Sequence, residues 1–385
     1  MLDSEQIINI IPNIHLFEDD TTKSLSVYSK FFLKNKKTRD YSHSMTYFFQ
    51  SSRNFWAYYL PPGKANLITI TTKYPNGRPP FVIVYPMGKS TKILAQNCRN
   101  LALKLQKHSG EKVILKKIPI KFVNEFHSAG FTEYLDNDGW SVSYKYDDDD
   151  YPEFIINIER YLSGRNNISR IPVPYATKTS NLRGHARRFI NWLDKEDCSI
   201  NINSYNPKKD YTDVKEMIST WAKFRKLRHR EEEIGDLLDS HECFLPNVDN
   251  INSGRSYKFN YTTTKLSKSI VMRLARKGES KVIAFGFIDR ISDTTAGIYS
   301  EIALHQRAES QHLTWDTIHQ TGVPGCSEVL TLIMLEIAFK SGYLFANFGG
   351  SESRTLFMNR KYKFPDYEKN KMTHLVLYYP PPETL

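Results

Sequence analysis

The stretch PGCSEVLTLIMLEIAFKSGYLFANFGGSES, residues 324–353, decides the fold of this chain. Its first half carries apolar residues at the spacing of one helical face, namely Val329, Leu330, Ile333, Met334, Ile337 and Ala338. Lys340 stands in the last turn and Gly342 lies just past it, and both are usual signals for the end of a helix. The spacing therefore predicts a buried helix that ends near Lys340.

A short strand and a glycine break follow this helix. Tyr343 to Phe348 is predicted to be a strand, and Asn347 belongs to it. Gly349 and Gly350 interrupt the strand and are expected to leave backbone N–H groups free to approach a ligand. A basic cluster comes next and consists of Arg360, Lys361 and Lys363. This order indicates a binding face at the end of a sheet, although it can also be purely architectural.

Three strands and a basic helix precede the quoted stretch. The strands are predicted at 269–275, 282–288 and 296–304, and Thr314 to Gln320 is predicted to form a helical turn after them. An amphipathic helix over 178–193 carries Arg183 and Arg187 four residues apart, with Arg188 beside them. Guanidinium groups match the geometry of phosphate oxygens, so we expect these arginines to bind phosphate. A merely exposed basic helix face is the alternative.

The first part of the chain has the pattern of a separate α/β domain. It alternates predicted strands with an amphipathic helix over 91–107. The acidic run Asp147 to Asp150 is interpreted as the boundary, with a cation site as the alternative. We therefore expect a first domain over residues 1–150, a linker helix and loop over 151–177, and a second domain over 178–385 that carries the active site.

Length and charge limit the possible partners. The chain has 385 residues, which suits two domains. Lysine and arginine number 53 against 42 acidic residues, for a net charge of +11. This balance favours a polyanionic partner such as nucleic acid, a phosphorylated ligand or an anionic lipid surface, and a solubilising surface charge is the alternative.

Several kinds of site are not indicated. The cysteines Cys98, Cys198, Cys243 and Cys326 are scattered and fit neither a metal-ligand spacing nor a disulfide framework. No Walker loop, GxGxxG unit, HExxH or GxSxG motif occurs, so we expect neither a metal nor a bound cofactor. No apolar run is long enough to cross a bilayer, and MLDSEQ is unlike a secretory signal. A soluble cytoplasmic protein is expected.

The order of predicted elements over residues 269–379 is that of the half-sheet of GNAT acyltransferases. The quoted run, followed by KYKFP, resembles the soluble catalytic domain of phosphatidylglycerol lysyl- and alanyltransferases. The segment LRGHARRF also resembles the basic helix that opens the second half in that family. The FemABX peptidyltransferases share the same layout. The resemblance implies an α/β fold of two tandem GNAT-like domains, with mixed sheets flanked by helices.

The chain departs from these families at several places. The GNAT pyrophosphate loop is missing, and HLTWDTIHQTGVPG stands in its place, which argues against ordinary acetyl-CoA chemistry. The family's Asp-x-x-Arg corresponds here to Asp316 and His319, and Pro365 directly follows Phe364. No membrane-spanning flippase accompanies the domain.

The resemblance implies transfer of an aminoacyl group from an aminoacyl-tRNA ester to an amine or hydroxyl. Attack on the ester carbonyl builds an oxyanion that needs a donor or a cation nearby. Lys361 and Lys363 share one face of a strand and are expected to neutralise that charge or the tRNA phosphates, with a lysine-protected edge strand as the alternative. Asp316 and His319 share one face of a helical turn. They are expected to bind the α-ammonium group and relay a proton, with a structural histidine as the alternative.

The predicted site and its partners complete this hypothesis. The residues expected to bind substrate or tRNA are Arg183, Arg187, Arg188, Asn347, Gly349, Gly350 and Arg360. The acceptor is expected to be a small soluble molecule or peptide, with at most transient contact with anionic lipid. The alternatives are an acyl-CoA-dependent N-acyltransferase, aminoacylation of phosphatidylglycerol, and a non-catalytic tRNA- or lipid-binding module.

Overall fold

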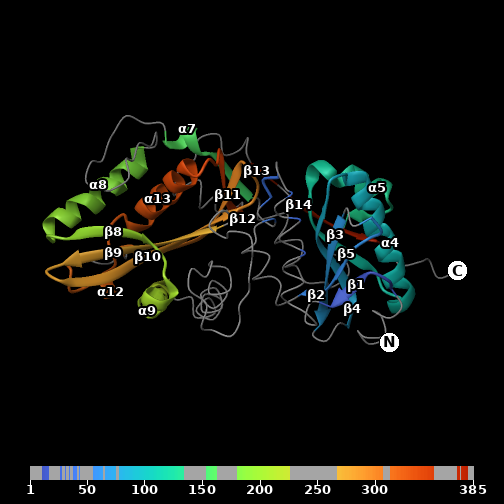
Figure 1. The fold of residues 1–385 in the computed structure, drawn as a ribbon, viewed down its shortest axis with the longest axis horizontal. Helices are drawn as coiled ribbons and strands as arrows, with labels where there is room; N and C mark the ends of the chain where they lie inside the picture. The colour runs from blue at the N-terminus through green and yellow to red at the C-terminus, as the bar shows by residue number, and fades with distance from the viewer. Residues whose placement is uncertain are drawn as a thin grey trace.

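The structure is a computed structural model with two mixed α/β halves. It describes residues 11–16, 27, 31, 34, 38–40, 43, 55–63, 66–74, 78–133, 153–162, 180–225, 267–306, 313–350, 371–372 and 374–379. Figure 1 shows two sheets side by side, each flanked by helices. The predicted α/β class with mixed sheets is confirmed.

The first sheet has seven strands in the order β1-β2-β3-β4-β5-β14-β6. Its strands are β1 (Ile14–Leu16), β2 (Phe55–Tyr59), β3 (Asn66–Tyr74), β4 (Arg78–Gly88), β5 (Val113–Pro119), β6 (Thr132–Glu133) and β14 (His374–Tyr379). Helix α4 (Thr91–Ser109) joins the parallel strands β4 and β5, and the short η2 (Ile120–Phe122) and α5 (Val123–Ser128) follow. The apolar stripe of α4 is buried against this sheet, as predicted.

The second sheet has seven strands in the order β13-β7-β12-β11-β10-β9-β8. Its strands are β7 (Glu153–Asn157), β8 (Ser199–Ser204), β9 (Ser267–Arg276), β10 (Glu279–Arg290), β11 (Thr295–Ala303), β12 (Phe345–Gly350) and β13 (Lys371–Met372). Its helices are α7 (Ile158–Leu162), α8 (Ser180–Lys195), α9 (Pro207–Arg225), α12 (Ile318–Thr321) and α13 (Cys326–Lys340). The three strands predicted before the quoted stretch are β9, β10 and β11, and the predicted strand in that stretch is β12.

Each sheet is completed by a strand from the other part of the chain. β14, near the C-terminus, pairs with β5 and β6 of the first sheet. β7 follows the first half in sequence but lies between β12 and β13 of the second sheet. In the stretch 151–177, expected to be a linker helix and loop, Glu153–Asn157 form strand β7 and only Ile158–Leu162 form a helix. The proposed boundaries at 150 and 178 therefore do not coincide with the sheets.

Helix α13 is the central helix of the second half. Only Ile337, Phe339 and Lys340 of its fifteen residues are not buried, so it is covered on nearly every side and not along one stripe alone. It packs on β10 where Gly286 leaves room, because a side chain there would meet Met334 and Leu330. This close packing holds α13 against β10.

Candidate functional site

The parallel strands β11 and β12 part in the middle of the second sheet. They pair only from Thr295 with Phe345 to Gly297 with Asn347. Beyond that point β11 continues beside β10, whereas β12 continues beside β7. Ligands of α/β sheets commonly bind where neighbouring strands separate at their carboxyl ends. The parting of β11 and β12 is therefore the candidate site, and the glycine break predicted from the sequence lies on it.

Asn347 is the polar centre of this parting. Its side chain is fully buried, and its amide nitrogen donates to Glu153 Oε2 at 2.7 Å and to the Arg39 carbonyl oxygen at 2.5 Å. Its amide oxygen accepts from the Gly349 N–H at 2.8 Å. Both amide hydrogens and the amide oxygen thus have partners within the protein. The side chain of Asn347 therefore joins β12 to β7 and to Arg39, and its predicted role in substrate binding stays a prediction.

The glycines of the break are bound within the protein as well. Gly349 has φ +75°, in the left-handed region that favours glycine, and its N–H is directed to Asn347. Gly350 is paired with Glu153 of β7. The Gly349 N–H is therefore not free for a ligand, contrary to the expectation from the sequence.

Arg39 brings the N-terminal part of the chain to this site. Its guanidinium carbon lies 3.6 Å from the centroid of the Phe345 ring, a cation–π contact on β12. Burial lowers the pKa of Arg39, and a guanidinium group nevertheless stays charged in proteins. Arg39 therefore docks on β12 through its guanidinium group and its carbonyl group. Nothing in the sequence pattern had pointed to Arg39.

The N-terminal end of α13 is covered by α8. Gly325 precedes α13 with φ +70°, and a side chain there would collide with the carbonyl oxygen of His185. His185 Nδ1 also lies 3.6 Å from Glu328 Oε1 in the first turn of α13. Arg188 contacts the imidazole of His185 at 3.2 Å. Arg187 is exposed, and Arg183 lies in α8 with its side chain outside the described residues.

This contact leads to a prediction about Gly325. Gly325→Ala should lower the free energy of unfolding by about 3 kcal/mol, because left-handed strain adds to a collision with backbone. Gly342→Ala, at the other end of α13, is the matched control, since Gly342 has φ +91° and no atom lies within 4 Å of the position that an added Cβ would take. It should lose only about 1 kcal/mol. Equal losses in urea unfolding of the two variants would show that α8 does not press on Gly325.

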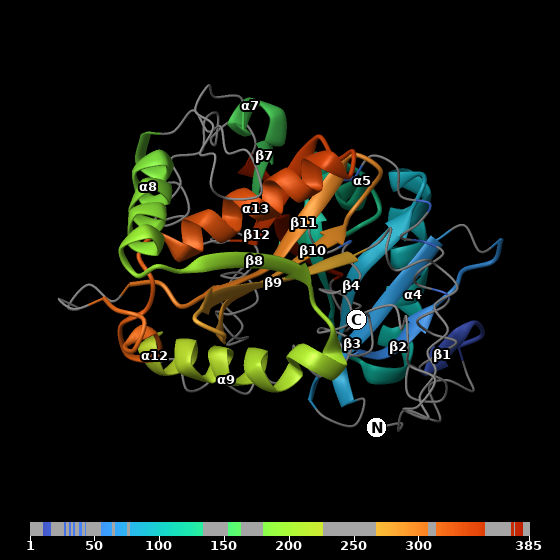
Figure 2. The same ribbon diagram turned by 60° about the vertical axis from the view of Figure 1, so that its left-hand side comes forward.

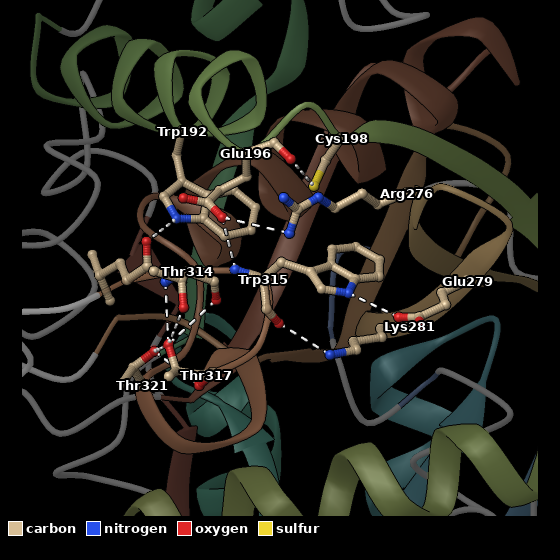
Figure 3. A network of polar contacts seen from close by, with 11 residues as sticks. Trp192, Glu196, Cys198, Arg276, Glu279, Lys281, Thr314, Trp315, Thr317 and Thr321 are labelled. Carbon is tan, nitrogen blue, oxygen red and sulfur yellow. Dashed lines mark hydrogen bonds and ion pairs between the residues drawn. The ribbon is translucent and has the colours of Figure 1, made fainter.

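A second polar network lies on the loop between β11 and α13 (Figure 3). The Trp315 N–H donates to Glu196 Oε2 at 2.9 Å, and its indole N–H donates to Glu279 Oε2 at 3.0 Å. Lys281 Nζ donates to the Trp315 carbonyl oxygen at 3.0 Å and lies 4.8 Å from the centroid of the Trp315 ring. Arg276 lies 4.0 Å from Glu196. Trp315 thus anchors the loop to the end of α8 and to the β9–β10 hairpin.

Asp316 and His319 lie on this loop, beside the Trp315 network. Asp316 is exposed in a turn, and His319 is half-buried in α12. Burial lowers the pKa of His319, and the nearby Lys281 lowers it further, while Glu216 raises it. Its Nδ1 atom is buried without a hydrogen-bond partner. His319 is therefore a neutral imidazole near pH 7.

The structure does not bring Asp316 and His319 to the parting of β11 and β12. Lys281, next to His319, lies eight residues from Asp289 on β10, and Asp289 stands level with Gly297 and Asn347. Eight residues of strand span about 26 Å. Figures 1 and 2 likewise show α12 near one end of the sheet, and β12 pairs with β7. Lys361, Lys363 and Arg360 fall outside the described residues.

Two further properties concern the described residues. No helix in the described ranges is long and apolar enough to span a membrane. Within those same ranges, no group of three or more His, Cys, Asp or Glu side chains is arranged to hold a metal ion.

Comparisons with known proteins found likeness in structure and not in sequence. No protein-family model and no curated protein matches the chain. A conserved protein of unknown function from Bacteroides thetaiotaomicron has a TM-score of 0.61 and 12% identity, covering 94% of this chain and 98% of that one. The C-terminal domain (DUF2156) of a protein described as a putative lysylphosphatidylglycerol synthetase, from Agrobacterium fabrum, has a TM-score of 0.51 and 11% identity, covering 93% and 92%. These two matches show that the fold is shared along nearly the whole chain, and the second agrees with the resemblance seen in the sequence.

Proposed function

We propose that this protein is an aminoacyltransferase that moves an aminoacyl group from an aminoacyl-tRNA ester to an amine or hydroxyl of a small soluble acceptor. The observation that carries the proposal is the shared fold with a domain described as part of a lysylphosphatidylglycerol synthetase, over 93% of this chain. The sequence motifs of that family lie on α8, α13 and β12. The net charge of +11 suits a tRNA donor.

The covered end of α13 supports a tRNA ester over an acyl-CoA donor. A pyrophosphate group binds a helix N-terminus through backbone N–H groups that point into open space. Here the carbonyl of His185 packs on Gly325, and the Glu328 carboxylate adds a negative charge beside the same turn. Both features oppose a bound pyrophosphate. The acyl-CoA alternative therefore requires α8 to move.

The proposed reaction needs only groups of the protein and its two substrates. The acceptor nitrogen or oxygen attacks the ester carbonyl carbon, the bond to the terminal ribose oxygen of the tRNA breaks, and a proton passes from the acceptor to that oxygen. A cation near the carbonyl stabilises the oxyanion. We propose Lys361 and Lys363 for this task, because they come soon after β12 in the sequence. Lys281, beside His319, lies about 26 Å along β10 from the level of Asn347. We therefore propose no shared role at one carbonyl for Asp316 and His319 with the residues after β12.

The test of the function is to follow the aminoacyl label to its acceptor. The protein is incubated with tRNA charged with labelled amino acids and with a small-molecule extract or with phosphatidylglycerol vesicles. Label in a soluble product supports the proposal, and label in the lipid favours phosphatidylglycerol as acceptor. Consumption of acetyl-CoA, without loss of the tRNA ester, would favour the acyl-CoA alternative. Binding of tRNA with no ester loss under any condition would favour a non-catalytic module.

The two lysines after β12 give a prediction about salt dependence. Lys361→Ala/Lys363→Ala should weaken tRNA binding and reduce the slope of log affinity against log salt by about 1.5, because each phosphate contact contributes about 0.7 to 0.9. Lys92→Ala/Lys107→Ala, two exposed lysines of α4, is the control with the same change of charge. Filter binding over a series of salt concentrations measures both. Equal salt slopes for the two double variants would show that Lys361 and Lys363 do not contact the tRNA.

A further inference from the structure

Strand β8 is an edge of the second sheet, and no strand in the described part of the chain pairs with its outer side. It pairs with β9 on one side, over six residues from Ser199 to Ser204. None of these six residues is charged or proline, the devices by which edge strands usually avoid pairing with another chain. The other sheet ends in the described part of the chain are β1, β6 and β13, which have three, two and two residues. Figure 2 shows β8 at the front of its sheet, between α8 and α9.

The outward backbone groups of β8 follow from its register. Tyr205 N–H donates to the Ser269 carbonyl oxygen, so this pair is of the hydrogen-bonded kind. Such pairs alternate along an antiparallel ladder, and therefore Asn203, Asn201 and Ser199 face β9 with their backbone groups. The N–H and C=O groups of the other three residues point away from the sheet; these residues are Ile200, Ile202 and Ser204. This gives three donors and three acceptors in a row.

The side chains of β8 also alternate. Ile200 and Ile202 pack against the core of the second half, while Asn201 and Asn203 are exposed. A partner strand that extends the sheet must place apolar side chains on the packed face and neutral polar ones on the other, or the face of the sheet is broken. The sequence of β8 itself has this alternation, so a second copy of β8 is a suitable partner strand.

We propose that β8 pairs with β8 of a second copy of this chain, antiparallel, about a two-fold axis at Ile202. In this register Ile202 faces its own copy on the packed side, and Asn201 faces Asn203 of the second copy on the exposed side. Ile200 lies opposite Ser204 of the second copy, and all six outward groups form hydrogen bonds. No like charges oppose each other within the paired strands, which favours a copy over a charged peptide. The inference goes beyond the proposed function and does not depend on it.

The first experiment measures mass in solution. Light scattering on the full chain should give twice the mass of one chain at high concentration. Asn201→Lys/Asn203→Lys should restore the single-chain mass, because the register sets lysines against lysines. Asn201→Ser/Asn203→Ser, which keeps the edge neutral, should retain twice the mass of one chain. Because each copy carries a net charge of +11, added salt should strengthen pairing of the unmodified chain. A single-chain mass of the unmodified protein at every concentration of protein and salt would overturn the proposal. A doubled mass that persists in Asn201→Lys/Asn203→Lys would overturn it as well.

The second experiment tests the register by disulfide formation. In a background with Cys198 and Cys243 replaced by serine, Asn201→Cys and Asn203→Cys variants are oxidised separately and as a mixture. Exposed residues that face each other in a non-hydrogen-bonded pair are close enough for a disulfide. The mixture should give covalent dimers of one variant with the other, and neither variant alone should. Covalent dimers from either variant alone, or none in the mixture, would contradict a two-fold axis at Ile202.

Discussion

Asn347→Asp is expected to lower the free energy of unfolding by about 4 kcal/mol, because it places a buried negative charge beside another carboxylate. The new carboxylate would face Glu153 Oε2, which lies 2.7 Å from the amide nitrogen, and the carbonyl oxygen of Arg39. Both hydrogen bonds from the amide nitrogen would become contacts between acceptors. The change is nearly isosteric, so packing is unaffected and the loss comes from electrostatics. Urea unfolding followed by circular dichroism measures it.

The control for Asn347→Asp is the same replacement on the surface. Asn191 is exposed on α8, and Asn191→Asp should change the free energy of unfolding by less than about 0.5 kcal/mol. Glu153→Gln and Asn347→Ala, alone and together, complete a double-mutant cycle. A coupling energy of about 1 to 3 kcal/mol is expected for residues in one hydrogen-bond network. A coupling energy near zero would show that Asn347 does not hold the strands together at the parting of β11 and β12. Equal changes in the free energy of unfolding for Asn347→Asp and Asn191→Asp would show the same.

Leu377→Asp is expected to unfold the N-terminal half of the protein, although Leu377 lies near the C-terminus. Its side chain is fully buried in the core of the first sheet, and β14 pairs there with β5. Gln106 of α4 also donates to the Tyr379 carbonyl oxygen at 3.0 Å. A buried charge in this core should cost about 4 kcal/mol or more. The first sheet should therefore lose its structure before the second sheet does.

Hydrogen exchange read by mass spectrometry locates that loss. In Leu377→Asp, peptides from α4 and β5 should lose protection, while peptides from α13 and β10 keep it. Leu103→Asp is the control, because Leu103 is 44% exposed on α4 and should change protection little. If protection is lost first in α13, or nowhere, then β14 does not complete the first sheet.

The local elements were predictable, whereas the exchange of strands between the sheets was not. Helix α13 carries strong periodicity and a glycine stop and forms as the sequence predicts. The strand after it was predicted over Tyr343 to Phe348, but β12 runs from Phe345 to Gly350 and includes the two glycines that were expected to interrupt it. The residues Glu153–Asn157 fall in the stretch expected to be a linker helix and loop, and their pairing with β12 and β13 makes them a strand. β14 joins strands that lie more than 240 residues earlier, and no local pattern records such a pairing.

The sequence pointed to the end of β12 but not to the contacts made there. The three partners of Asn347 come from β7, from Gly349 two residues further along β12, and from Arg39, 308 residues away. Asp316 and His319 were grouped by their spacing of three residues. Trp315, directly before them, is held by Glu196 and Glu279, which fixes the loop at the far end of the sheet. The contacts of Asn347 and the position of the loop with Asp316 and His319 both depend on side chains from distant segments of the sequence.

The most direct test of the proposed function is the lifetime of the aminoacyl ester. Purified protein is mixed with labelled aminoacyl-tRNA and with the acceptor mixture, and acid-precipitable label is followed over time. The proposed function predicts that the ester disappears faster with the protein than without it, and that the label passes to an acceptor. Lys361→Ala/Lys363→Ala should slow the loss of the ester, and Lys92→Ala/Lys107→Ala should not. An unchanged ester lifetime, across acceptors and charged tRNAs, would contradict an aminoacyltransferase.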